Sequence, residues 1–143
     1  MIRPCFLVID REFPGSISTR KLVIETAKFN VLTAYSGKEA IELFKLFPAV
    51  SGVVLDGGLD DTPCNVVAAA IKSLHPHVPI IVIAAPGFHN CPQADYHVES
   101  FDPARLLEIL RSLKPEASAA IEKRNEDLSR EQLSALNKKP STP

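Results

Sequence analysis

The chain has 143 residues, of which 45% are hydrophobic, so it is long enough for one domain with a substantial core and too short for two full domains. Sixteen lysines and arginines nearly balance seventeen aspartates and glutamates, and the net charge of −1 provides no overall attraction to nucleic acid or an anionic membrane. No apolar run is longer than that of residues 80–85, which is far below the roughly 20 residues of a membrane-spanning helix, and the first residues do not resemble a secretory signal. We therefore expect a cytoplasmic protein that binds neither nucleic acid nor membranes.

The first part of the chain alternates apolar strands with amphipathic helices. Residues 5–9 form a continuous apolar run, which is typical of a strand buried on both faces, and the next helix has Ser16 or Ser18 available as its N-cap. Residues 31–34 form the second strand, and the Ser-x-x-Glu pattern of residues 36–39 predicts a capping box at the start of the second helix. The buried residues predicted for this helix are Ala40, Leu43, Phe44 and Phe47.

The third strand, residues 52–55, ends at Asp56 and leads through a glycine-rich loop to a helix that we expect Asn65 to cap. Residues 80–83 form the fourth strand, with the strongest β-branched signal in the sequence, and residues 96–98 form a weak fifth strand. The buried residues predicted for the third helix are Val67, Ala70, Ile71 and Leu74.

A last helix is predicted after Asp102, which is a good N-cap before a proline in the first turn. Its predicted buried residues are Leu106, Leu110 and Leu113. Beyond this helix the composition becomes charged and rich in alanine and serine, without a steady heptad. We therefore expect one domain over residues 1–115, followed by a helical or disordered tail over residues 116–143.

Strands that are apolar throughout and alternate with helices are typical of a parallel sheet with helices on both faces. In such sheets, ligands bind at the carboxyl ends of the strands. Asp10 and Asp56 each follow or end a predicted strand, so they are expected at the same edge of the sheet. These two acids form the candidate site.

The order of these segments resembles the receiver domain of bacterial two-component response regulators. The match covers about residues 5–113 and needs no gap between Asp10 and Ile83. It implies an α/β, flavodoxin-like (CheY-like) three-layer sandwich with a five-stranded parallel sheet. Only fifteen positions separate Ala84 from Glu99, so we expect the fourth helix of the family to be shortened or missing. The segments that carry the resemblance are residues 6–12, 31–40, 52–56, 79–83 and 101–107.

The resemblance implies a phosphorylation site that this sequence has changed. In the family, an aspartate accepts a phosphoryl group, an acidic pair helps to hold Mg²⁺, and a hydroxyl and a lysine hold the product. Asp10 matches the first acid of the pair and Asp56 matches the acceptor. Arg11 stands at the second acid, Ala84 at the hydroxyl position and Glu99 at the lysine position. Asp56 is therefore interpreted as a vestigial phospho-acceptor, and the switch position is lost at Ala84.

The substitutions retain three carboxylates (Asp10, Asp56 and Glu99) and one cation, which has moved to Arg11. Our hypothesis is that the Arg11 guanidinium reaches toward Asp56 or Glu99 and takes the space and charge of Mg²⁺. Two alternatives remain open. In the first, Arg11 points into solvent and Asp56 has no role. In the second, Asp56 is still phosphorylated, with Mg²⁺ as cofactor.

The sequence thus predicts a receiver-like signalling module that is not an enzyme, needs no metal or cofactor and acts independently of phosphorylation. Its expected partner is a protein, namely a kinase, a regulator, an output protein or a second copy in a homodimer. The alternatives are a conventional response regulator phosphorylated on Asp56, or a small-ligand binder on the same fold. The three cysteines, Cys5, Cys64 and Cys91, are expected to be reduced thiols because their number is odd and their spacing wide.

Overall fold

The computed structural model describes residues 3–11, 19–87, 91–100 and 102–114, together with four residues further along the chain. The strands are β1 (Cys5–Ile9), β2 (Asn30–Ala34), β3 (Gly52–Asp56), β4 (Ile80–Ala84) and β5 (Tyr96–Glu99). The helices are α1 (Thr19–Thr26), α2 (Gly37–Leu46), α3 (Cys64–Leu74) and α4 (Pro103–Leu113).

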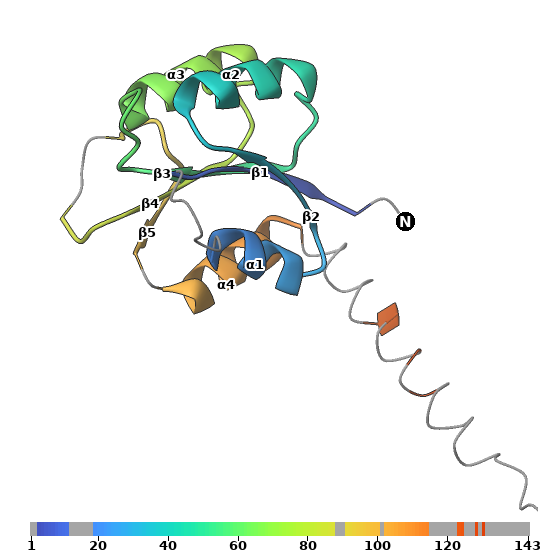
Figure 1. Cartoon of the computed structure of the whole chain (residues 1–143). Helices are drawn as coiled ribbons and strands as arrows, with labels where there is room; N and C mark the ends of the chain where they lie inside the picture. The colour runs from blue at the N-terminus through green and yellow to red at the C-terminus, as the bar shows by residue number, and fades with distance from the viewer. Residues whose placement is uncertain are drawn as a thin grey trace, which may run out of the picture.

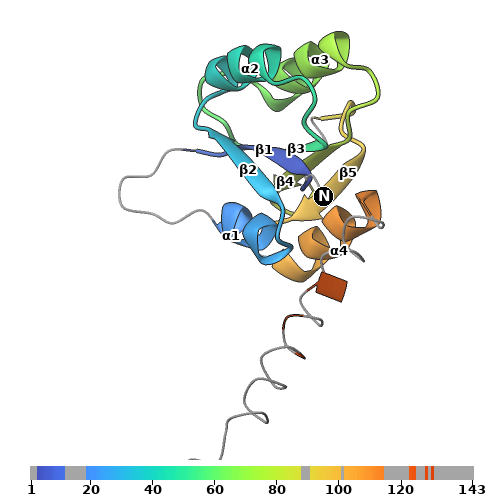
Figure 2. The same cartoon turned by 90° about the vertical axis from the view of Figure 1, so that its right-hand side faces the viewer.

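These elements form three layers, with α2 and α3 on one face of the sheet and α1 and α4 on the other (Figure 1). Figure 2 shows the same layers from the side, with α1 and α4 packed next to each other. All strand pairs are parallel, in the order β2-β1-β3-β4-β5, which is the doubly wound order of flavodoxin-like sheets. The predicted fold class is therefore confirmed.

Alternate side chains of the central strands enter two separate cores, because successive residues of a strand point to opposite faces. The core under α2 and α3 includes Leu7, Ile9, Val53, Leu55, Ile80 and Val82. The core over α1 and α4 includes Phe6, Val8, Val54, Ile81, Ile83 and Val98. With both faces covered, β1, β3 and β4 bury nearly every side chain, which explains why the sequence shows continuous apolar runs there rather than alternation.

Two of the predicted helix starts are confirmed. The Ser36 hydroxyl accepts a hydrogen bond from the backbone N–H of Glu39 at 3.1 Å, as the capping box predicts. Asp102 accepts from the backbone N–H of Arg105 at the same distance, directly before the proline that starts α4. Both caps fix the point at which the chain turns back from the sheet.

Three details of the predicted helices are wrong. Asn65 does not cap α3, because the helix begins one residue earlier and its first amide groups donate to the backbone carbonyl of Pro63. Phe47 follows α2 as its C-cap, where the backbone has left the helical path, and its side chain is exposed. Leu74, the last residue of α3, is also exposed, and Ala68 is buried on the inner face of that helix.

In the connection between β4 and β5, no helix occurs within residues 85–87 and 91–95, the parts that the structure describes. This agrees with the expected shortening or loss of the family's fourth helix. The predicted N-caps Ser16 and Ser18 lie outside the described residues. Of the predicted tail, only four residues are described, and all four are helical and exposed: Lys123, Arg124, Leu128 and Arg130. None of the helices within the described ranges combines the length and hydropathy that a bilayer crossing requires.

Candidate functional site

The carboxyl edge of the sheet brings Asp10 and Asp56 together. Asp10 follows β1, Asp56 ends β3, and the two strands pair directly with Ile9 opposite Leu55. Asp56 is only 3% exposed and is the one charged or polar side chain in the buried class among the described residues. A buried carboxylate requires compensating partners, since burial without them is costly.

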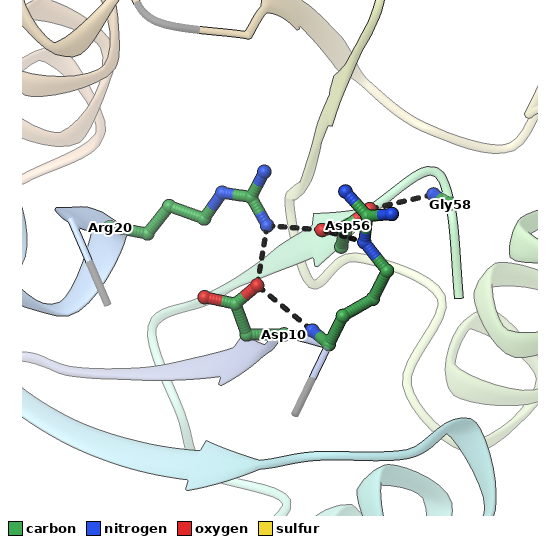
Figure 3. Close-up of polar contacts among 5 residues, drawn as sticks. Asp10, Arg20, Asp56 and Gly58 are labelled. Carbon is green, nitrogen blue, oxygen red and sulfur yellow. Dashed lines mark hydrogen bonds and ion pairs between the residues drawn. The ribbon is translucent and has the colours of Figure 1, made fainter. Parts of the chain in front are cut away.

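Arg20 supplies the main partner from the first turn of α1. Its Nη1 atom donates to Asp56 Oδ2 at 2.6 Å and to Asp10 Oδ1 at 2.8 Å. Figure 3 shows this single nitrogen placed between the two carboxylates. A cation in the first turn of a helix is unfavourable for the helix dipole, so the two carboxylates provide the charge that holds it there. The Arg20 side chain is 17% exposed, which makes this a largely desolvated bridge.

Arg11 forms the outer part of the same cluster. Its backbone N–H donates to Asp10 Oδ1 at 2.9 Å, and its side-chain Nε lies 3.3 Å from Asp56 Oδ2. The guanidinium is turned toward Asp56, which is the direction expected from the sequence, but its side chain is 43% exposed. Arg11 therefore contributes less than Arg20, because solvent screens an exposed ion pair.

The second oxygen of Asp56 is held by the loop after β3. The backbone N–H of Gly58 donates to Asp56 Oδ1 at 2.6 Å. A Cβ atom at position 58 would lie 3.3 Å from that same oxygen and 3.6 Å from the Arg11 guanidinium carbon, so glycine allows this close approach. Both carboxylate oxygens of Asp56 thus accept hydrogen bonds from within the chain.

Burial alone would raise the pKa of Asp56, because the charged form loses hydration. The hydrogen bonds from Arg20 and Gly58 and the positive charges of Arg20 and Arg11 outweigh burial, and the pKa lies below its ordinary value. Asp56 is therefore ionised at neutral pH. Among the described residues, two carboxylates and two guanidinium groups then make a cluster with no net charge.

Glu99 and Ala84 lie opposite each other at the ends of β5 and β4, and Ala84 directly follows Ile83, which pairs with Asp56. They help to line a shallow pocket of about 330 Å³, together with Gly87 and His97. Glu99 is exposed, and none of the ion pairs among the described residues includes it. The structure thus joins Asp10, Asp56 and Arg11 of the predicted site and adds Arg20, while the inclusion of Glu99 in an acidic pocket stays a prediction.

Arg20 was not predicted from the sequence, although a signal for it exists. A helix that follows a strand of a parallel sheet starts at the carboxyl edge, so a cation in its first turn lies above the acids at the strand ends. Arg20 occupies such a position, and its long side chain covers the remaining distance to β3.

Asp61 is a second residue with an unexpected role. Its carboxylate accepts from the backbone N–H groups of Gly37 at 2.9 Å and Lys38 at 3.2 Å, so it satisfies the start of α2 from the loop after β3. The Gly37 N–H is the main cause of the lowered pKa of Asp61. Asp61 therefore links the loop after β3 to the start of α2.

The residues present do not fit Mg²⁺. This cation needs oxygen ligands in near-octahedral geometry, usually with one or two carboxylates and several waters. Here the space between Asp10 and Asp56 contains a guanidinium nitrogen, and position 11 carries a second cation. Within the described ranges, no group of three or more histidine, cysteine, aspartate or glutamate side chains is arranged to hold a metal ion.

No protein-family model matches the chain, and no curated protein matches it. Many solved structures do match, and response regulator receiver domains are among them. One from Clostridium thermocellum has a TM-score of 0.66 and 22% identity, over 87% of this chain and 98% of that one. The response regulator TrrA of Thermotoga maritima, solved with Mg²⁺ and beryllofluoride, has a TM-score of 0.64 and 25% identity, over 77% and 98%. CheY of Borrelia burgdorferi, in a complex with CheX, beryllofluoride and Mg²⁺, has a TM-score of 0.66 and 23% identity, over 78% and 90%.

The chain therefore has the fold of the response regulator receiver domain. Two of the similar structures hold beryllofluoride with Mg²⁺, and one of these two is a complex with another protein.

Proposed function

We propose that this chain is a receiver-like module of a two-component signalling system that acts through protein contacts without phosphorylation of Asp56. The observation that carries the proposal is the position of Arg20 Nη1, within hydrogen-bond distance of both Asp10 and Asp56. In this position the guanidinium supplies, inside the chain, the positive charge that a divalent cation supplies in a receiver of the ordinary kind.

The hydrogen bonds to Asp56 argue against its use as a nucleophile. Both carboxylate oxygens accept hydrogen bonds, one of them from a guanidinium, and these contacts stabilise the negative charge and so weaken the carboxylate as a nucleophile. Transfer also depends on positive charge placed at the phosphoryl oxygens, because the transition state is stabilised almost entirely by position and charge. Both guanidinium groups are instead engaged with the carboxylates, and Ala84 has no hydroxyl with which to hold a product.

A role in protein contacts is favoured by the fold and by a similar structure. CheY of Borrelia burgdorferi has this fold and is bound to CheX, which demonstrates a protein partner for that receiver. In the present chain, the guanidinium groups of Arg11 and Arg20 already balance the charges of Asp10 and Asp56, so one arrangement of this cluster is stable in the absence of a phosphodonor. We infer that the partner recognises this single arrangement, and that the module is a constitutive docking unit rather than an enzyme.

Titration with beryllofluoride and Mg²⁺, followed by amide chemical shifts, tests the proposal. We expect no saturable shift at Gly57, Gly58 or other amides near Asp56 at millimolar Mg²⁺, and no incorporation of phosphate from acetyl phosphate. Saturable shifts centred on Asp56, or an acyl-phosphate that Asp56→Asn abolishes, would establish the conventional phosphorylated response regulator instead.

A rebuilt site provides the matched positive control. Arg11→Asp combined with Arg20→Gln restores a second acid and removes the bridging cation, which leaves three carboxylates at the edge. This variant should bind Mg²⁺ at millimolar concentrations, because oxygen ligands for a hard cation are then free. Arg105→Ala, which removes an exposed arginine paired with Glu108 on α4, should behave as the unchanged chain. If the rebuilt variant keeps the amide spectrum of a folded chain and still fails to bind Mg²⁺, the arginines are not what prevents binding and the proposal fails.

A further inference from the structure

Two cysteines that are far apart in the sequence meet in the core beside α3. Cys64 is the first residue of α3 and Cys91 lies in the connection between β4 and β5. Both are buried free thiols, and their sulfur atoms are 2.6 Å apart. Nonbonded heavy atoms pack best at about 3.5–4.0 Å, and the bond of a disulfide is about 2.05 Å, so this separation lies between contact and a covalent bond.

The surrounding contacts hold the connection against α3 at a second point. Lys72, near the end of the helix, donates to Asp95 at 2.8 Å and to the backbone carbonyl of Val78 at 2.7 Å. Asp95 also accepts from the backbone N–H of Ile80 at 2.8 Å. The Cys64–Cys91 contact at the start of the helix and the Lys72–Asp95 ion pair near its end therefore fix this part of the connection along one helix.

We propose that Cys64 and Cys91 form a reversible disulfide that locks the β4–β5 connection to α3 under oxidising conditions. The oxidant is a low-molecular-weight disulfide. One cysteine thiolate attacks a sulfur of this disulfide, forms a mixed disulfide and releases one thiolate. The second cysteine, as its thiolate, then attacks the protein sulfur of the mixed disulfide and releases the other. In total, two protein thiols become one disulfide, and one small disulfide becomes two small thiols.

The two thiols are not equivalent, which favours this exchange. The Cys64 thiol donates a hydrogen bond to the sulfur of Cys91. This hydrogen bond lowers the pKa of Cys91 and, together with burial, raises the pKa of Cys64. Cys91 is therefore the thiol that ionises first and starts the exchange. Since both side chains are buried, the oxidant reaches them through local opening, and the closed protein then brings the sulfurs together. In a reducing environment the same pair remains two thiols, as the sequence predicts.

Equilibration of the full chain in glutathione redox buffers tests this inference. After acid quenching and alkylation, the reduced chain should carry three alkyl groups and the oxidised chain one, at Cys5, with the mass of two hydrogen atoms lost. The half-oxidation ratio is the ratio of the two forms of glutathione at which half of the pair is oxidised. For native disulfides of ordinary strength, this ratio differs by about 30- to 900-fold between native buffer and concentrated urea. We expect a value in this range.

Cys5→Ser is the matched control, because it removes the remaining thiol and keeps the pair. In this variant, both cysteines should be alkylated or neither, at every glutathione ratio. Cys91→Ala should prevent the mass loss and remove any difference in urea midpoint between oxidising and reducing buffers. Stable glutathione adducts on Cys64 or Cys91, two free thiols in glutathione disulfide alone, or an equal half-oxidation ratio in buffer and urea would each overturn the inference. None of these results depends on whether Asp56 is phosphorylated.

Discussion

Substitution of Arg20 by alanine should strongly destabilise the fold, because it removes the main partner of a buried carboxylate. Asp56 is 3% exposed and would keep only the Gly58 N–H and the 3.3 Å contact with the exposed Arg11 side chain. Asp10 would lose the same guanidinium at 2.8 Å. One substitution thus affects two of the strand ends that meet at this edge.

The magnitude follows from the geometry. Two unit charges 4 Å apart interact by about 4 kcal/mol at an effective dielectric constant of 20, and desolvation of the guanidinium offsets part of this. Loss of one member of a buried ion pair costs about 3–5 kcal/mol when the other charge is left without compensation. Since Arg11 and Gly58 still contact Asp56, we expect Arg20→Ala to lower the free energy of unfolding by about 3 kcal/mol, near the lower end of this range. With an m-value of about 1.5 kcal/mol per M, the urea midpoint falls by about 2 M.

Urea denaturation of Arg20→Ala, Asp56→Asn and the double variant provides the assay. The double variant should be more stable than Arg20→Ala alone, because asparagine leaves no buried charge to compensate. The two substitutions should therefore be strongly non-additive. A loss below about 1 kcal/mol for Arg20→Ala, or additive effects in the cycle, would refute the argument that this bridge holds the carboxylates.

Two further predictions concern pH and packing. The folded-state pKa of Asp56 is lowered, so the contribution of its ionised form to stability is present above the unfolded pKa of about 3.9 and is lost as pH falls through the folded-state pKa. The stabilities of the unchanged chain and Asp56→Asn, followed by acid titration, should therefore converge below about pH 4. Parallel acid profiles would contradict this. Gly37→Ala should cost about 1–3 kcal/mol in urea denaturation, since its Cβ would lie 2.7 Å from Thr62 Cβ and 2.8 Å from Val67 Cγ2. The neighbouring exposed Lys38→Ala should change stability by less than about 0.5 kcal/mol, and an equal effect of both substitutions would show that the packing argument is wrong.

Hydrophobic periodicity and capping were sufficient to predict a parallel sheet with helices on both faces, because each strand and helix carries its own local signal, whereas the flavodoxin-like arrangement came from the family resemblance. The continuous apolar run of β4 and the side-chain caps at Ser36 and Asp102 depend on residues close in the sequence. The errors occur at helix ends. At Phe47 and Leu74 the hydrophobic pattern continues, but the backbone leaves the helix or the helix ends, so the side chains are exposed.

The candidate site was only partly predictable, because its contacts join distant parts of the chain. Asp10 and Asp56 could be placed together since parallel neighbouring strands end at one edge. Arg20 is thirty-six positions from Asp56, and no local pattern indicates that its side chain bridges two strands. The same holds for Cys64 and Cys91, whose spacing in the sequence matches no known motif and whose proximity depends on the path of the β4–β5 connection.

A guanidinium that belongs to the chain differs from a metal ion because it cannot be removed by a chelator or by dialysis. Short tethers give a group an effective concentration of about millimolar or more near its target, whatever the composition of the medium. The ion pair of Arg20 with Asp10 and Asp56 forms whenever the protein folds. We therefore expect EDTA to leave the melting temperature and the near-UV spectrum unchanged, and we expect the charge balance of Arg20, Asp10 and Asp56 not to depend on the supply of magnesium.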